Sequence, residues 1–309
     1  MFQGMHYVYE VYKEMSFSKA ARNLFISQPS LSAAVKKAEA QIGFPIFDRS
    51  SNHIQLTELG KEYIRSIEII MDVENGFQNY INDMKELKSG TIAIGGTNLF
   101  ASYVLPPLLS RFTEQYPQVQ VNLVEATTSQ LTDRLFSGSL DLLIDNKNMD
   151  PAVYQKSFFC EEHLLLAVPI RLAVNEKMKN YALTASDIRE NRHLNSRIPP
   201  VPLENFQEES FLLLKSGNDT RTRADRICHN AHVIPKIKLE LDQQITAYNL
   251  SRYGMGISFC SDTLVRHVPD DEGLVYYKLD HKDALREVNF YYKRGRYMPR
   301  VVSTFLEMI

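Results

Sequence analysis

The sequence lacks the features that would mark a membrane, secreted or polyanion-coating protein. No apolar run reaches the roughly 20 residues that cross a bilayer, and no basic segment followed by an apolar one opens the chain, so we expect neither a membrane protein nor a secreted one. The 309 residues carry a net charge of −2, so any affinity for nucleic acid must be local. A chain of this length allows two or three domains.

Cysteine is also scarce. Cys160, Cys228 and Cys260 are far apart and odd in number, which argues against a disulfide scaffold and for a reducing compartment, so we expect a cytoplasmic protein. A redox pair stays open because sequence does not show proximity, although buried and inert thiols are the commoner outcome. His163 follows Cys160 and His229 follows Cys228, but neither spacing repeats with a second pair of ligands. We therefore predict neither a metal site nor a cofactor.

The usual catalytic signatures are missing too. The chain has no Gly-x-Ser-x-Gly elbow, no Gly-Lys-Ser/Thr phosphate loop and no His-Glu-x-x-His pair, and Gly254-Met-Gly256 is too short for a dinucleotide fingerprint. An enzyme with an accessory helical domain therefore remains an alternative, but no catalytic motif supports it. A solute-binding protein is a second alternative, which the lack of a leader disfavours.

The stretch from Ser16 to Arg49 predicts two short helices joined by a tight turn, the layout of a helix-turn-helix DNA reader. We expect Ser18 to cap the first helix and Ser27 the second, with Pro29 in the first turn, where its missing N–H costs little. Gly43 is expected to end the second helix.

The second of these helices has two distinct faces. A buried stripe is predicted by four apolar residues at spacings of four, three and four: Leu31, Val35, Ala38 and Ile42. Pro29, Ala33 and Lys36 fall on the far face, with Ser32 at its edge. An ordinary pair of core helices is the alternative interpretation of this segment.

The flanking residues favour the DNA reader. Phe25 and Ile26 are expected to make apolar contacts at the bend, and Phe44 to Phe47 to fold back as an apolar plug. Ser50 to Leu56 predicts a wing of two short strands beside the DNA. Basic residues exceed acidic ones between residues 16 and 55, which suits phosphate contacts: Lys19, Arg22, Lys36, Lys37 and Arg49 against Glu39 and Asp48.

Residues from Glu58 to about Lys88 predict one long helix, which Thr57 would cap and which would extend roughly 45 Å. Its apolar stripe consists of Leu59, Tyr63, Ile67, Ile70, Phe77, Ile81 and Met84. Such a helix needs a partner, most simply the same helix of a second subunit. Packing on its own domain is the alternative.

Beyond a hinge at residues 88–90, predicted strands and helices alternate, which indicates an α/β sheet with crossover helices. The expected elements are strands at 91–95, 119–124 and 140–144 and helices at 102–116 and 129–136. Near the end, a strand at 288–293 precedes a helix with one apolar face, made of Val302, Phe305, Leu306 and Ile309.

Residues 5–60 resemble the winged helix-turn-helix of LysR-type transcriptional regulators. The matching pieces are SFSKAA, ISQPSLS, Gly43, FPIFDR and LTELG. Further on, GGTNLFASYVLPPLLSRF, GSLDLLI and YGMGISF resemble the effector domain of the same family. The resemblance covers nearly the whole chain and is more diffuse after Asp150.

The resemblance implies an α/β protein with an N-terminal winged helix-turn-helix, a long linker helix and a periplasmic-binding-protein-like effector domain of two subdomains. The implied bounds are 1–57, 58–90 and 91–309, with subdomain I at about 91–160 and 270–309 and subdomain II at about 161–269. The resemblance also implies dimers or tetramers on near-palindromic operators, RNA polymerase as a partner, and a role in transcription rather than catalysis.

Site residues follow from the same resemblance. DNA contacts are implied for Gln28, Pro29, Ser30, Ser32 and Lys36, with Arg49 and His53 near the backbone. Many members of the family carry Arg where this chain has Ala33, so a guanine contact in the major groove is absent or comes from elsewhere. The implied effector contacts are Thr97, Asn98, Thr128, Asn146, Lys215, Ser216 and Asn218.

These effector positions lie at the ends of strands and the starts of helices, where backbone N–H groups and hydroxyls seat anions. We therefore expect a small polar ligand that carries a carboxylate, and ordinary helix capping is the alternative for the same residues. A ligand that prefers a closed cleft would then alter DNA binding through the linker helices.

Overall fold

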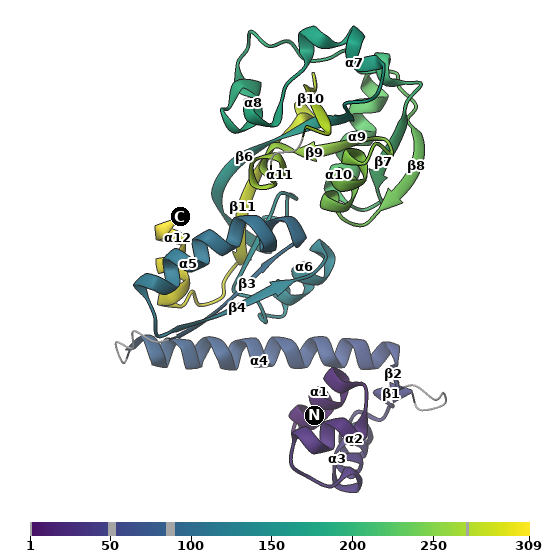
Figure 1. The fold of residues 1–309 in the computed structure, drawn as a ribbon. Helices are drawn as coiled ribbons and strands as arrows, with labels where there is room; N and C mark the ends of the chain where they lie inside the picture. Colours follow the sequence, from purple (N-terminus) through teal and green to yellow (C-terminus); the bar gives the residue numbers. More distant parts are fainter. Residues whose placement is uncertain (1, 49–53, 85–89, 270–271) are drawn as a thin grey trace.

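The computed structural model describes residues 2–48, 54–84, 90–269 and 272–309. The N-terminal part contains three helices followed by a short antiparallel pair of strands: α1 (Met5–Glu14), α2 (Phe17–Asn23), α3 (Gln28–Ile42), β1 (Phe47–Asp48) and β2 (Gln55–Leu56). A helix of 27 residues, α4 (Glu58–Met84), follows directly. Figure 1 shows α4 lying between these N-terminal elements and the rest of the chain.

The three short helices and the first turns of α4 share one apolar core. The predicted stripe of α3 faces it, since Leu31, Val35 and Ala38 are buried and Ile42 packs against them. Ser27 caps α3 by accepting a hydrogen bond from the Ser30 N–H at 3.2 Å. Gly43 ends the helix at a φ of 86°, a conformation that glycine adopts without strain. These predictions are confirmed.

Three local predictions in this region are wrong. Ser16 caps α2 rather than Ser18, because the Ser16 hydroxyl accepts from the Lys19 N–H one turn further on. Phe25 makes no apolar contact at the bend: its backbone is left-handed, with φ 55°, and its side chain is 95% exposed. Phe44 is also exposed, so the apolar plug consists of Ile46 and Phe47 alone.

From Gly90 onwards the chain follows a single path of hydrogen-bonded strands, in the order β4-β3-β5-β11-β6-β9-β7-β8, with β10 also paired to β6. The strands of the first half are β3 (Gly90–Gly96), β4 (Val119–Glu125) and β5 (Leu142–Asp145). Its helices are the π-helix η1 (Phe100–Val104), α5 (Leu105–Gln115), α6 (Thr128–Phe136) and α12 (Arg300–Met308).

The second half has the same alternation. Its strands are β7 (Ser210–Leu214), β8 (Lys236–Leu241), β9 (Ile257–Ser261) and β10 (Leu274–Lys278). Its α-helices are α7 (Val174–Lys177), α8 (Ala185–Arg189), α9 (Asp219–Asn230), α10 (Gln244–Arg252) and α11 (Asp262–His267). Short 3₁₀ turns complete it: η2 (Lys179–Tyr181), η3 (Arg192–Leu194), η4 (Leu203–Phe206) and η5 (Lys282–Ala284).

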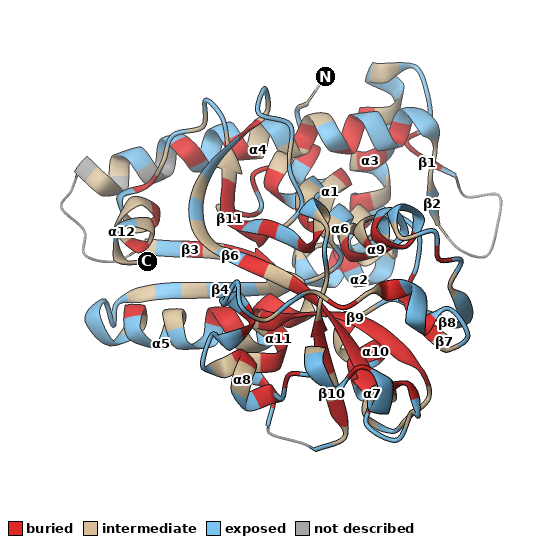
Figure 2. Ribbon diagram, turned by 90° about the horizontal axis from the view of Figure 1, so that it is seen from above, coloured by how far each residue is buried: buried red, intermediate tan, exposed pale blue. Residues whose placement is uncertain are grey.

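Two long strands cross between the halves, β6 (Tyr154–Pro169) and β11 (Leu285–Lys293), and they pair with each other antiparallel. Figure 2 shows that buried residues concentrate along the strands of both halves. The expected return to the first subdomain at residue 270 is wrong. Strand β10 pairs with residues 165–169 of β6 in the second half, so the chain returns only with β11.

Helix α4 also packs on the first subdomain. The buried Asp72 forms ion pairs with Lys293 at 3.0 Å and Arg296 at 2.7 Å. Asp83 accepts hydrogen bonds from the Tyr297 hydroxyl and the Arg300 N–H. A row of apolar side chains on α4 stays exposed nonetheless: Ile69, Val73, Phe77 and Tyr80. The helix therefore packs on its own effector domain along one side and leaves another side open.

Gly138 provides a test of this packing. It has a φ of 79°, and a Cβ there would overlap the Asp72 carboxylate, whereas Gly295 has a φ of 74° and no atom within 4 Å of such a Cβ. Left-handed strain costs about 1 kcal/mol at either position. We expect Gly138→Ala to lower the free energy of unfolding clearly more than Gly295→Ala in urea titrations. Equal losses would mean that the contact between Gly138 and Asp72 does not matter for stability.

Candidate DNA interface and effector pocket

The outer face of α3 is open to solvent. Gln28, Pro29, Ser30 and Lys36 are exposed and Ser32 is half-buried. Ser30 has a second role, because its hydroxyl shares a 2.7 Å hydrogen bond with the capping hydroxyl of Ser27. Two further predicted DNA contacts, Arg49 and His53, lie outside the described residues.

Three lysines around this face have no ion-pair partner within the described part of the chain. Lys19, Lys36 and Lys37 are exposed and form no ion pair with any residue that the structure describes. Lys13, on the other hand, pairs with Glu10 on the same helix at 3.4 Å. An exposed helix flanked by free ammonium groups has the shape and charge that a major groove accepts.

A cavity of about 330 Å³ lies between the two halves of the effector domain, a size suited to a small ligand. The structure brings all the predicted effector residues to its wall: Thr97, Asn98, Thr128, Asn146, Lys215, Ser216 and Asn218. The helices α6, α9 and α10 begin at this wall, because their first residues Thr128, Asp219 and Gln244 line it. Capping side chains already accept from the N–H groups of Gln130 in α6 and Thr220 in α9, and the other first-turn N–H groups make the wall attractive to an anion.

Several of these side chains already have protein partners. The Thr128 hydroxyl donates to Asp145 at 2.9 Å, and the Asn146 amide donates to Glu162 at 3.1 Å. Asn218 caps α9 by accepting from the Thr220 N–H. Capping therefore accounts for Asn218, as the alternative interpretation held.

Two more predicted residues are also engaged. The Asn98 amide donates to Glu125 at 2.8 Å, and the Lys215 ammonium pairs with Asp242 at 2.8 Å. A ligand carboxylate would therefore compete with Asp242 for the Lys215 charge.

The floor of the cavity is charged, which the sequence alone did not reveal. Arg286 of β11 donates through Nε to Glu162 at 2.7 Å and through Nη1 to Asp219 at 2.9 Å. Asp145 lines the cavity at the end of β5, and its burial raises the pKa of its carboxyl. One signal was available: Asp145 is the single charge in the otherwise apolar strand β5.

The three cysteines are free thiols. Cys228 and Cys260 are buried and Cys160 is half-buried. Burial, the largest cause, raises the pKa of Cys160 and of Cys228 to about 12, so both remain protonated at neutral pH. Their environment is that of inert core thiols.

Two family models match the chain. The model for the bacterial regulatory helix-turn-helix protein of the lysR family matches residues 2–61, and the model for the LysR substrate binding domain matches residues 85–309. The chain therefore belongs to the LysR family: it is a DNA-binding transcriptional regulator with an effector-binding domain.

Curated relatives agree along nearly the full length. The uncharacterized HTH-type transcriptional regulator YcgK of Bacillus subtilis is 28% identical, over 98% of this chain and 92% of the relative. A probable RuBisCO transcriptional regulator of Synechocystis is 24% identical, over 96% of this chain and 81% of the relative.

Solved structures show the same fold. A full-length OxyR variant from Pseudomonas aeruginosa has a TM-score of 0.71 at 21% identity, covering 99% of this chain and 93% of that one. CbnR complexed with its target DNA has a TM-score of 0.65 at 16% identity, covering 100% and 98%. No helix among the described segments has the length and apolarity needed to cross a bilayer.

Lys36 tests the interface. We expect Lys36→Ala to weaken DNA binding for all sequences and to reduce the salt slope of log K by about one, because one phosphate contact is lost. The measurement is fluorescence anisotropy on operator and random duplexes over a range of salt. Lys13→Ala, which removes a charge already paired with Glu10, is the control and should change neither quantity. Unchanged affinity and slope in Lys36→Ala would rule out the assigned face of α3.

Proposed function

We propose that this regulator binds DNA through the outer face of α3 and responds to a small, carboxylate-bearing effector in the cavity between its subdomains. The convergence of all the predicted effector residues on one cavity carries the proposal. The proposal gives the chain no reaction to catalyse. Its place of action is the cytoplasm, where its DNA would be.

The proposed DNA contacts come from the start and outer face of α3. Gln28, Pro29 and Ser32 would approach base edges, while Lys36 would meet a phosphate. Ser30 would contribute mainly through the cap it shares with Ser27. The wing residues Arg49 and His53 would lie near the backbone. The complex of CbnR with its target DNA, a protein of the same fold, supports this mode of binding.

The proposed effector class follows from the wall of the cavity. Three helix N-termini converge there, and each favours a negative group through the helix dipole and the first-turn N–H donors that no capping side chain occupies. Lys147 and Lys215 add positive charge. Negative charge on the same wall comes from three carboxylates: Asp145, Asp219 and Asp242. The ligand must therefore present its carboxylate to the helix ends and its other polar groups to these aspartates.

A physical route connects this cavity to the DNA-binding part. Strand β11 carries Arg286 at the cavity end and Lys293 at the other end, and Lys293 pairs with Asp72 of α4. A ligand that shifts Arg286 would thereby move a strand anchored to the linker helix. This contiguous element is the proposed carrier of the allosteric signal.

We also propose that α4 pairs with a second subunit through its exposed apolar row, which would otherwise face water. Two recognition helices would then meet two half-sites, and a near-palindromic operator follows. Dimers could assemble further into tetramers, and RNA polymerase is the expected partner at the promoter.

The effector proposal is tested by titration calorimetry against small carboxylates, followed by operator footprinting with and without each binder. Thr97→Val replaces one cavity hydroxyl by a methyl group of similar size. We expect about a tenfold loss of affinity for a carboxylate that binds, because one hydrogen bond is lost. Thr113→Val, on α5 and away from the cavity, is the control. Footprints that stay the same with every binder would remove the allosteric part of the proposal.

Phe77 tests the subunit contact. Its side chain is 64% exposed on α4, and a charge there would oppose burial between two helices. We expect Phe77→Asp to shift the protein towards monomers in sedimentation velocity. Asn75→Asp puts the same charge about 160° round the helix and should leave assembly intact. If Phe77→Asp assembles like the unmodified protein, α4 does not form the interface through this face.

A further inference from the structure

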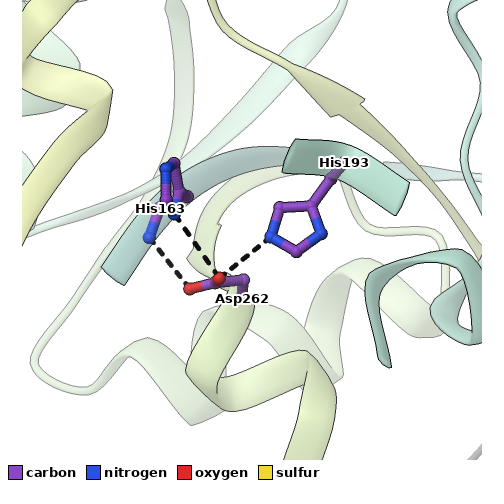
Figure 3. A group of neighbouring side chains, drawn as sticks. All are labelled: His163, His193 and Asp262. Atoms are coloured by element: carbon purple, nitrogen blue, oxygen red, sulfur yellow. Dashed lines mark hydrogen bonds and ion pairs between the residues drawn. The ribbon is translucent and has the colours of Figure 1, made fainter. Parts of the chain in front are cut away.

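Two histidines and an aspartate from distant parts of the chain meet outside the effector cavity. Figure 3 shows His163 on β6, His193 in η3 and Asp262 at the start of α11. One nitrogen of each ring and one carboxylate oxygen all lie within 4.8 Å of one another. None of the three residues lines the cavity described above.

The spacing of these atoms suits a tetrahedral ion. Nε2 of His193 lies 3.0 Å, and Nδ1 of His163 lies 3.7 Å, from Oδ2 of Asp262. Zinc bonds of 2.0–2.2 Å to nitrogen and oxygen place neighbouring ligands about 3.3 Å apart, between those two values. We propose that His163, His193 and Asp262 bind a divalent transition-metal ion of the zinc type, with water as the fourth ligand.

The carboxylate of Asp262 is already oriented for metal binding. Its Oδ1 accepts a hydrogen bond from the backbone N–H of His163 at 2.9 Å, which orients the group and leaves Oδ2 towards the rings. Its Oδ2 faces Nε2 of His193 at 3.0 Å and Nη2 of Arg266 at 3.2 Å.

His193 is not satisfied by its protein neighbours. Its Nε2 lies 3.0 Å from Asp262 and 3.4 Å from the Arg266 guanidinium, and its buried Nδ1 has no hydrogen-bond partner among the described residues. A protonated Nε2 can donate to Asp262 but cannot accept from Arg266, and the other tautomer has the reverse limit. A metal ion bound at Nε2 would use the lone pair of that nitrogen. Only Nδ1, which has no hydrogen-bond partner among the described residues in any case, would then remain unpaired.

Arg266 would compete with a metal ion for the position beside Oδ2 of Asp262. Its Nη2 lies 3.2 Å from Oδ2 of Asp262, so in the metal-free protein its positive charge faces this carboxylate. The Arg266 side chain is 28% exposed, and His163 is 30% exposed, so the guanidinium can turn to solvent and the site is open to an ion. Binding therefore requires Arg266 to leave, and its removal should favour the metal.

The position of this site gives it a structural consequence. His163 and Glu162 are neighbours on β6 and point to opposite faces of the strand. Glu162 bonds Arg286 at the floor of the cavity, while His163 faces η3 and α11. A bound ion would join the crossing strand to two other segments of the second subdomain.

The test is equilibrium dialysis of the full-length, chelator-stripped protein against Zn²⁺, with the bound metal counted by mass spectrometry. We expect about one ion per chain. His163→Gln should weaken binding by at least the 10- to 100-fold that loss of a supporting group costs at such sites. His267→Gln changes an exposed histidine on the same helix α11 and should leave binding unchanged.

Arg266→Gln distinguishes a metal site from a hydrogen-bonded cluster. Removing the competing charge should tighten zinc binding about tenfold, and zinc should raise the Tm of this variant but not that of His163→Gln. Failure of both the unmodified protein and Arg266→Gln to bind zinc would overturn the proposal. So would a loss of binding in Cys160→Ser, which would assign the metal to a thiol, or equal losses in His163→Gln and His267→Gln.

Discussion

A buried arginine joins the two halves of the effector domain. Arg286 lies on one crossing strand and bonds Glu162 on the other, and it also bonds Asp219 and Thr220 at the start of α9. Charges taken out of water in this way are stable only as a group, and removal of one partner typically costs 3–5 kcal/mol. This cluster fixes where the two crossing strands meet the start of α9 in the second subdomain.

In the proposed mechanism, the same strand relates ligand binding to DNA binding. Arg286 at the cavity floor and Lys293 at the other end of β11 are seven positions apart (286 to 293), and Lys293 forms one of the two ion pairs of Asp72. Arg296, which forms the second ion pair, lies in the loop after β11. A paired strand in the middle of a sheet transmits a displacement along its length because its neighbours resist bending. Helix α4 is itself continuous with the core of the N-terminal domain, through Tyr63, Ile64 and Ile67. The molecule therefore needs no flexible segment to connect its two functions.

The sequence predicted the features that depend on residues close together in the chain. The stripe of α3, the Ser27 cap and the Gly43 end all follow from residues within four positions, and all are found. The prediction for Phe25 was wrong because a residue with a left-handed backbone turns its side chain outward here, which no apolar pattern reveals. The predicted boundary of the second subdomain was wrong because β10 pairs with β6 across about a hundred residues. Arg286 and the His163 cluster were missed for the same reason, since Asp262 lies 69 positions from His193 and 99 from His163.

The strand path ends at β4 on one side and β8 on the other, and each pairs with only one neighbour among the described residues. These two borders differ in their protection. The sequence of β8, KIKLEL, places Lys236, Lys238 and Glu240 along its edge, and such charges discourage a foreign strand from docking. The sequence of β4, VQVNLVE, has no lysine and exposes Leu123. Backbone-mediated aggregation therefore has its weakest barrier at β4, and any assembly that covers this border also protects the protein from misassociation.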